Sequence, residues 1–260
     1  MRSPDELPPR ALASAAADIL QQLRARGPHV HCITNTVAQN FTANVLLALG
    51  CLPSMTLSAG EIGDFVAGSD ALLVNLGTFD RERREASEIA VDSARRGHVP
   101  WVLDPVFVDR SAPRAGFARV LIGRGPHVLR LNRAEFSALA GGAATPDALV
   151  AYAHDKNLTV GLSGEADWVA DSERIATIAN GHALMAKVTA MGCAGSALNA
   201  ACLAVEPDAW RATAAALIIV GVAGEVAAAR AAGPGSFAVA IVDALYNLDG
   251  PTLIAHAKVT

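Results

Sequence analysis

The sequence predicts an α/β fold with a mostly parallel central sheet covered by helices. Short runs rich in β-branched and aliphatic residues alternate with longer, alanine-rich runs of helical character, which is typical of strands joined by crossover helices. With 260 residues, 52% of them hydrophobic, the chain can bury a large core. No linker, repeat or low-complexity segment interrupts it, so we expect a single domain over residues 1–260.

Each element is placed by its apolar pattern and its flanking turn residues. Strands are expected at residues 30–34, 71–76, 101–104, 127–131 and 158–162. Helices are expected at residues 12–26, 37–49, 83–96, 133–140, 193–205, 208–230 and 237–248. Residues 167–180 differ, because two short β-like runs flank a polar turn. That segment predicts a hairpin that adds antiparallel strands at one edge of the sheet.

Charge and composition narrow the class of partner. A formal charge of -4 and a pI near 6.0 provide no basic stripe, which argues against a nucleic-acid partner. The apolar run at residues 212–229 is interrupted by Glu225, so we expect a buried helix and no membrane span. The start of the chain, MRSPDELPPR, lacks the apolar run of a signal peptide. We therefore expect a cytoplasmic protein that acts on small molecules, with its four cysteines reduced.

Polar residues follow several of the expected strands. Asn35 follows the first strand, Gly77 and Thr78 follow the second, Asp104 ends the third, and Asn132 follows the fourth. In an open α/β sheet the ligand lies beyond the carboxyl ends of the strands, so these residues are candidates for a site. Each also has a structural explanation, since Asp before Pro is common in turns and Asn is a common helix cap.

The segment KVTAMGCAGSA, residues 187–197, is the strongest local signal. Small residues open a helical run there, and Gly192 and Gly195 allow an anion to approach the backbone at a helix N-terminus. The glycines are equally compatible with tight helix packing. The chain has no GxxxxGK[ST] motif and no GxGxxG after a strand, so a nucleotide would be held in another way.

Several motifs together resemble the hydroxyethylthiazole kinase family of the ribokinase-like superfamily. The similarity covers residues 28–248, nearly the whole chain. It rests on ITNTVAQNFTANVLLALG (33–50), PSM (53–55), VNLGT (74–78), DPV (104–106), NRAE (132–135), VTAMGC (188–193) and GPGSF (233–237). The resemblance implies a ribokinase-like three-layer sandwich. It also implies ATP- and Mg²⁺-dependent phosphorylation of the hydroxyethyl group of 4-methyl-5-(2-hydroxyethyl)thiazole in thiamine salvage.

The resemblance also implies roles for individual residues. Asp104 and Glu135 resemble the acidic pair that holds magnesium, a hard cation that prefers oxygen ligands. Three residues fall at ATP-binding positions: Arg130, Ser163 and Gly192. A guanidinium suits phosphate oxygens because it is planar and carries several donors.

The resemblance also implies which residues bind the alcohol that accepts the phosphoryl group. Met55, Ala190 and Asn35 are expected to bind the thiazole alcohol. Cys193 occupies the position at which other ribokinase-like enzymes have an aspartate base. A thiol at a helix N-terminus has a lowered pKa, so Cys193 is either a modest base or a group that orients the acceptor hydroxyl. Both roles remain open, because phosphoryl transfer needs little base catalysis.

Three departures from the family pattern fall near the expected site. Ala190 replaces a glycine, Phe107 follows Asp-Pro-Val where glycine is usual, and Leu131 replaces the glycine of Arg-Gly-Asn. They keep three alternatives open: a kinase of another vitamin-like alcohol such as hydroxymethylpyrimidine, a same-fold NAD(P)H-hydrate dehydratase, and a non-catalytic binding protein. The dehydratase would be expected to have aspartate in place of Cys193. The resemblance further implies a homotrimer with active sites between subunits.

Overall fold

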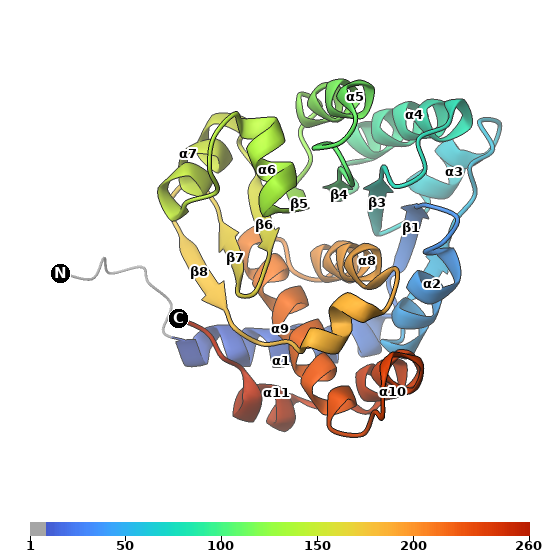
Figure 1. The fold of residues 1–260 in the computed structure, drawn as a ribbon. Helices are drawn as coiled ribbons and strands as arrows, with labels where there is room; N and C mark the ends of the chain where they lie inside the picture. The colour runs from blue at the N-terminus through green and yellow to red at the C-terminus, as the bar shows by residue number, and fades with distance from the viewer. Residues whose placement is uncertain (1–8) are drawn as a thin grey trace.

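The computed structural model describes residues 9–260, and within them the strands form one twisted sheet (Figure 1). The sheet has the order β2-β1-β3-β4-β5-β6-β7-β8. Strands β1 to β6 are parallel to one another. β7 pairs antiparallel with β6, and β8 pairs antiparallel with β7. The strands are β1 (His29–Ile33), β2 (Leu52–Ser54), β3 (Ala71–Asn75), β4 (Trp101–Asp104), β5 (Val128–Asn132), β6 (Thr159–Ser163), β7 (Asp167–Ala170) and β8 (Ile175–Ile178).

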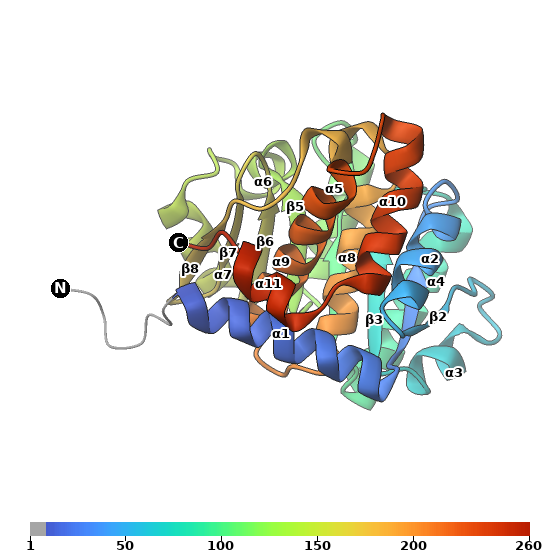
Figure 2. The same ribbon diagram turned by 90° about the horizontal axis from the view of Figure 1, so that it is seen from below.

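Helices cover both faces of this sheet, which makes the three layers that the sequence predicts (Figures 1 and 2). One face carries α1 (Pro9–Arg26), α2 (Gln39–Ala48), α8 (Met191–Leu203), α9 (Ala209–Ala228), α10 (Pro234–Asn247) and α11 (Gly250–His256). The other carries α3 (Ile62–Ala67), α4 (Arg81–Gly97), α5 (Ala112–Ile122), α6 (Arg133–Ala140) and α7 (Pro146–Lys156). The central strand β3 is buried along its whole length, as a parallel strand between two helical layers should be.

The long apolar helix α9 lies in the core, as expected. It is long and apolar enough to cross a bilayer, but its most apolar 18-residue window is 78% buried inside the fold. Glycines let neighbouring segments approach it closely. A methyl group added to Gly224 would lie 2.5 Å from Met185 Sδ, and one added to Gly221 would lie 2.6 Å from Asn180 Cβ. Alanine and glycine therefore serve close packing in this helix.

Most element positions match the expectation to within three residues, and the hairpin of β7 and β8 is confirmed. Several elements were not anticipated: β2, α3, α5, α7, α11 and a 3-10 helix, η1 (Ala183–Lys187). β2 has only three residues and contains Pro53, so it carries no alternating pattern. The start of α8 is earlier than expected, because it begins at Met191 and makes Cys193 its third residue. The sequence prediction about a signal peptide falls largely on residues 1–8, which lie outside the described residues.

The C-terminal segment pairs with the outer side of β8. Thr177 and Thr260 exchange two backbone hydrogen bonds, of 2.7 and 3.0 Å, and the Ala179 N–H donates to the Lys258 carbonyl at 2.8 Å. The buried Asn180 side chain fixes this arrangement, since it accepts from the Lys258 N–H at 2.7 Å and donates to the His256 carbonyl at 2.8 Å. The tail thus extends the antiparallel edge of the sheet (Figure 1).

Candidate active site

Polar residues from several elements meet at the carboxyl ends of the central strands, beside the start of α8. Asn35 follows β1, Asn75 ends β3, Asp104 ends β4, and Cys193 lies in the first turn of α8. A chain of side-chain hydrogen bonds connects them. The strand register puts Asn75 directly opposite Asp104. The expectation that strand-end residues gather at one edge is therefore met for Asn35 and Asp104.

The carboxylate of Asp104 is buried and already accepts two hydrogen bonds. Asn75 Nδ2 donates to Oδ2 at 2.7 Å, and the Ser196 hydroxyl donates to the same oxygen at 2.8 Å. Burial, and secondly the nearby charge of Glu135, raise the pKa of Asp104 to about 6. Two acidic groups held together in this way favour a cation between them.

Glu135 is held by the backbone around it. Its side chain and that of Asn132 form a capping box at the start of α6, in which the Asn132 N–H donates to Oε2 at 2.9 Å. The Phe107 N–H donates to Oε1 at 2.8 Å. Asn132 is thus a helix cap, the structural role weighed for it from the sequence. The capping box fixes the carboxylate of Glu135 beside the loop that follows Asp104.

The acidic pair fits magnesium better than an ion that needs a full protein cage. No group of three or more His, Cys, Asp or Glu side chains able to hold a metal occurs in residues 9–260. Mg²⁺ is commonly bound through one or two carboxylates together with waters and substrate phosphates. Asp104 is buried close to the charge of Glu135, and a cation here would offset first the cost of burying this carboxylate and second the repulsion from Glu135.

Arg130 provides a buried positive charge beside the first turns of α8. Its side chain is only 7% exposed and donates to the Ser163 hydroxyl, and Nε has no hydrogen-bond partner among the described residues. A methyl group added to Gly195 would lie 3.7 Å from Arg130 Nη2, so the guanidinium faces the first turns of α8. A buried guanidinium with an unsatisfied donor is suited to an anion.

The first turn of α8 offers backbone donors next to this guanidinium. The early N–H groups of a helix have no intrahelical partner and carry the positive end of the dipole. A side chain added at Gly192 would meet no described atom within 4 Å, so the backbone there faces open space. Arg130 thus contacts Ser163 and faces the helix that begins near Gly192, and the role of these three residues in ATP binding stays a prediction.

Cys193 lies in the first turn of α8, close to Asp104, but its thiol is not activated. Asn35 Nδ2 donates to its sulfur at 3.2 Å. Burial, and secondly the charge of Asp104, raise the pKa of the Cys193 thiol to about 11. The expectation of a lowered pKa at this helix start is wrong, because desolvation outweighs the backbone dipole. The thiol is protonated at neutral pH.

The chain is similar to known proteins over nearly its whole length. A profile described as the hydroxyethylthiazole kinase family matches residues 20–250. The chain belongs to this family. It is 44% identical over 247 residues to a probable hydroxyethylthiazole kinase of Agrobacterium fabrum, with 95% of each chain covered. It is 43% identical to a hydroxyethylthiazole kinase of Granulibacter bethesdensis, with 92% of each covered.

Solved structures agree with this membership and with the fold. A hydroxyethylthiazole kinase structure from Pyrococcus horikoshii superimposes with a TM-score of 0.91 at 36% identity, covering 94% of this chain and 98% of the other. A ribokinase-like superfamily protein from Enterococcus faecalis gives a TM-score of 0.68 at 14% identity, covering 90% of this chain and 95% of the other, which speaks for the fold alone. The ribokinase-like three-layer sandwich is confirmed.

Two departures from the hydroxyethylthiazole kinase pattern occupy left-handed backbone conformations. Ala190, the N-cap of α8, has a φ of 71°, and Phe107, after the Asp-Pro-Val motif, has a φ of 60°. The family pattern has glycine at both positions, and glycine adopts such angles without steric cost. The third departure, Leu131, is different. It is buried within β5, and its φ is not positive. Ala190 and Phe107 therefore adopt these backbone conformations at the cost of local strain.

Replacing Ala190 by glycine should stabilise the protein. The substitution removes a left-handed alanine, and we expect the free energy of unfolding to rise by about 1 kcal/mol. Urea unfolding at equilibrium measures this change. Ala194→Gly is the matched control, because Ala194 lies inside α8 and the same substitution there should destabilise by about 1 kcal/mol. Destabilisation by Ala190→Gly would contradict the strain assignment.

Met55 lies apart from the hydrogen-bonded group. It follows the edge strand β2, which pairs with β1, and it is partly buried against the core. The loop around it is held by the buried His31, which bonds Ser54 Oγ through Nδ1 at 2.8 Å and the Thr56 carbonyl through Nε2 at 3.1 Å. Because a carbonyl only accepts, Nε2 carries the proton and Nδ1 accepts from Ser54. Met55 thus flanks the site from the neighbouring strand end.

Two polar residues of the site were missed by sequence reasoning. Asn75 was placed inside the expected strand 71–76, and Ser196 inside the expected helix 193–205, where polar side chains attract little attention. Both are buried and both donate to Asp104. The available signal was the motif VNLGT, in which an asparagine interrupts an apolar run that is otherwise fully buried.

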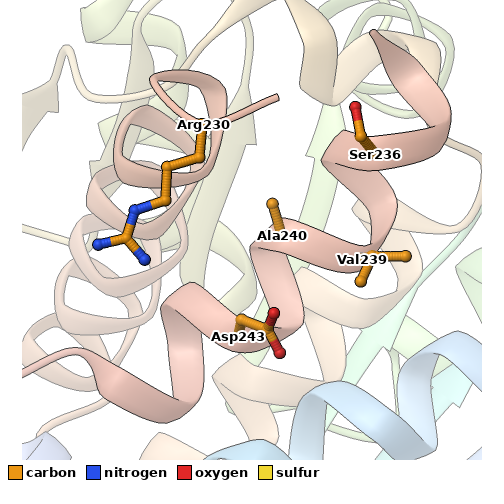
Figure 3. A pocket seen from close by; sticks show the side chains of 5 residues that line it. All are labelled: Arg230, Ser236, Val239, Ala240 and Asp243. Carbon is orange, nitrogen blue, oxygen red and sulfur yellow. The ribbon is translucent and has the colours of Figure 1, made fainter. Parts of the chain in front are cut away.

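A cavity of about 370 Å³ lies elsewhere, between the end of α9 and α10 (Figure 3). It is lined by Arg230, Ser236, Val239, Ala240 and Asp243, and none of the predicted site residues borders it. Its polar lining residues, Arg230, Ser236 and Asp243, are exposed. The cavity is therefore not the candidate active site.

Proposed function

We propose that the protein phosphorylates the hydroxyethyl group of 4-methyl-5-(2-hydroxyethyl)thiazole, with ATP as the donor, as a step of thiamine salvage. The observation that carries the proposal is that the buried Asp104, with Glu135 close to it, and the buried Arg130 both lie beside the glycine-bearing first turns of α8. The family membership supports the identity of the acceptor. It also favours this activity over a hydroxymethylpyrimidine kinase and over a dehydratase.

Each side chain has a distinct task in this proposal. Asp104 and Glu135 would hold Mg²⁺, which when bound neutralises charge on the reacting phosphates. Arg130 and Ser163 bind phosphate oxygens, together with the backbone N–H of Gly192. Met55, Asn35 and the turn at Ala190 bind the thiazole alcohol. Positioning and charge neutralisation supply most of the rate in phosphoryl transfer, and this site provides both.

Cys193 is proposed to orient the acceptor hydroxyl. Its thiol is protonated at neutral pH, and its sulfur accepts from Asn35, which leaves the S–H free to bond the hydroxyl oxygen. Cys193→Ser should then keep the rate within about tenfold, since a hydroxyl makes the same kind of bond. Cys193→Asp should be much slower, because a carboxylate there lies beside Asp104 and the incoming phosphate.

Single-turnover phosphorylation at saturating ATP tests both the function and this role. Wild type should convert the thiazole alcohol to its phosphate and release ADP, whereas hydroxymethylpyrimidine and NAD(P)H hydrate should not react. No phosphorylated product from wild type would favour the non-catalytic binding protein. A rate for Cys193→Asp at or above that of wild type would instead identify residue 193 as the position of a base.

We also propose a homotrimer, supported by an apolar exposed face on neighbouring elements. α2 packs against both α10 and β2 (Figure 2). Their exposed large apolar side chains are Leu47, Leu52, Val239 and Tyr246. Large apolar side chains exposed on neighbouring elements are typical of a subunit interface.

Light scattering should give a mass three times that of the 26.7 kDa chain. Val239→Lys should reduce this mass, because it buries a charge in the interface. The matched control is Val120→Lys on α5, on the opposite face of the sheet, which should leave the trimer intact. A monomer mass for wild type at micromolar concentration would contradict the proposal.

A cytoplasmic location and a single kinase domain over residues 1–260 complete the proposal. The four cysteines are free, and three of them are buried, which suits a reducing compartment. One continuous sheet links strands from β1 to β8, which supports a single unit. Fractionation of cells that express the native chain, followed by immunoblotting, tests the location.

A further inference from the structure

We infer that Asn75 is a positioning residue that couples the metal side of the site to the acceptor side. Resting on the proposed function, this inference assigns a task to a residue that touches neither substrate nor metal. Asn75 is 1% exposed and ends the central strand β3. Its Nδ2 donates to Asp104 Oδ2 at 2.7 Å, and its Oδ1 accepts from Asn35 Nδ2 at 3.1 Å. One amide therefore bridges the two halves of the site.

The orientation of both amides follows from backbone donors. The Gly77 N–H donates to Asn75 Oδ1 at 3.0 Å, and the Ala38 N–H donates to Asn35 Oδ1 at 3.0 Å. A backbone N–H can only donate, so each Oδ1 is an oxygen and each Nδ2 faces the other way. The two N–H bonds of Asn35 Nδ2 then go to Asn75 and to the Cys193 sulfur, which lies at 3.2 Å.

These bonds form a closed ring through α8. Asp104 Oδ2 also accepts from the Ser196 hydroxyl at 2.8 Å, and Ser196 lies three residues after Cys193 in the same helix. The ring thus runs Asp104, Asn75, Asn35, Cys193, Ser196 and back to Asp104. Asn75, Asp104 and Ser196 are buried, and Asn35 and Cys193 are half-buried. A closed network of this kind has few alternative arrangements, so a change at one member displaces the others.

Close packing at Gly77 supports the same conclusion independently. A methyl group added to Gly77 would lie 2.6 Å from Asn35 Nδ2 and 2.8 Å from Asn35 Cβ. Such distances are too short for real contacts, so the backbone at Gly77 holds the Asn35 side chain in place. The Gly77 N–H meanwhile fixes Asn75. The turn after β3 therefore sets both asparagines at once.

The most informative substitution is Asn75→Asp, which preserves shape and reverses one hydrogen-bonding role. It places a carboxylate oxygen where Nδ2 now donates, so Asp104 loses a donor and faces a like charge. We expect the affinity for a magnesium-bound, non-hydrolysable ATP analogue to fall by about 10- to 100-fold, as for other residues that orient metal ligands. The affinity for the thiazole alcohol should fall in parallel, because repulsion from Asp104 displaces the side chain of residue 75 and with it the oxygen that holds Asn35.

Gly77→Ala and Asn75→Ser provide two further variants. Gly77→Ala should weaken binding of the thiazole alcohol more than binding of the ATP analogue, since it pushes on Asn35 first. Asn199→Asp is the matched control: Asn199 is a fully buried asparagine of α8 that bonds Thr213 outside the ring. It should lower the melting temperature and leave both affinities unchanged.

Titration calorimetry of the two ligands separately, with the melting temperature of each variant, tests the inference. Parallel loss of both affinities in folded Asn75→Asp protein supports it. Affinities within twofold of wild type, or loss of only one of them, would overturn it. Should Asn75→Asp fail to fold, Asn75→Ser is judged by the same criterion. Wild-type protein that binds both ligands but transfers no phosphate would refute the proposed function and leave this test valid.

Discussion

Asp104→Asn should nearly abolish phosphoryl transfer and at the same time stabilise the protein. The substitution removes a charge that would neutralise the reacting phosphates through magnesium, and losing one such electrostatic group costs about 10²- to 10³-fold in rate. Turnover at saturating ATP and magnesium measures the loss. Asp92→Asn removes a surface carboxylate paired with Arg124 and should leave turnover unchanged. Near-normal turnover in folded Asp104→Asn protein would contradict the magnesium assignment.

The stability change has a defined pH dependence. The pKa of Asp104 is raised from 3.8 to about 6, so the folded state holds this proton more tightly than the unfolded state. The wild-type protein therefore loses stability as the pH rises from about 4 to about 6, by up to about 3 kcal/mol. An asparagine side chain at this position carries no charge at any pH in this range. The melting temperature of Asp104→Asn should thus exceed that of wild type at pH 7.5, and the difference should shrink towards pH 4.

Arg130→Lys should lower turnover by about 100-fold and raise the KM for ATP, although it keeps the charge. The guanidinium donates to Ser163 and faces the start of α8. The side chain packs against Gly161, where an added methyl group would lie 3.1 Å from Arg130 Cδ. An ammonium group cannot bind two phosphate oxygens in this planar way. Arg130→Met should be slower still, because it removes the charge as well.

Arg174→Lys is the matched control for this prediction. Arg174 pairs with Asp171 and Asp208, and Asp171 begins the turn between β7 and β8, beyond the amino end of β6. The substitution should lower the melting temperature without changing the KM for ATP. A KM for ATP in Arg130→Lys equal to that of wild type would place the phosphates elsewhere.

Much of the candidate site could be predicted from the sequence, because the ends of strands can be recognised in an α/β chain. Asp104 and Asn35 stand directly after apolar runs, and the segment that contains Gly192 and Cys193 is marked by its small residues. Arg130 and Ser163 came from family resemblance, since nothing in their local pattern distinguishes a buried guanidinium from an exposed one. Burial depends on the whole fold and cannot be predicted from a few neighbouring residues.

The features that could not be predicted from the sequence also depend on the whole fold. The pKa of Cys193 was expected to fall because only the helix start was visible, whereas burial and Asp104 raise it. The left-handed angles of Ala190 and Phe107 were hidden because neither residue type suggests them. Asn75 was hidden because its partners are about 40 residues before it and 29 after it in the chain.

The pairing of the C-terminal segment with β8 affects how readily the protein aggregates through the edge of its sheet. Exposed strand edges invite pairing with another chain and so promote aggregation. At one edge the C-terminal segment pairs with the N–H and C=O of Thr177 in β8, and at the other edge β2 has only three residues and carries Pro53. Trimming the chain after Lys258 should uncover β8 and make the protein more prone to form β-sheet aggregates on mild heating.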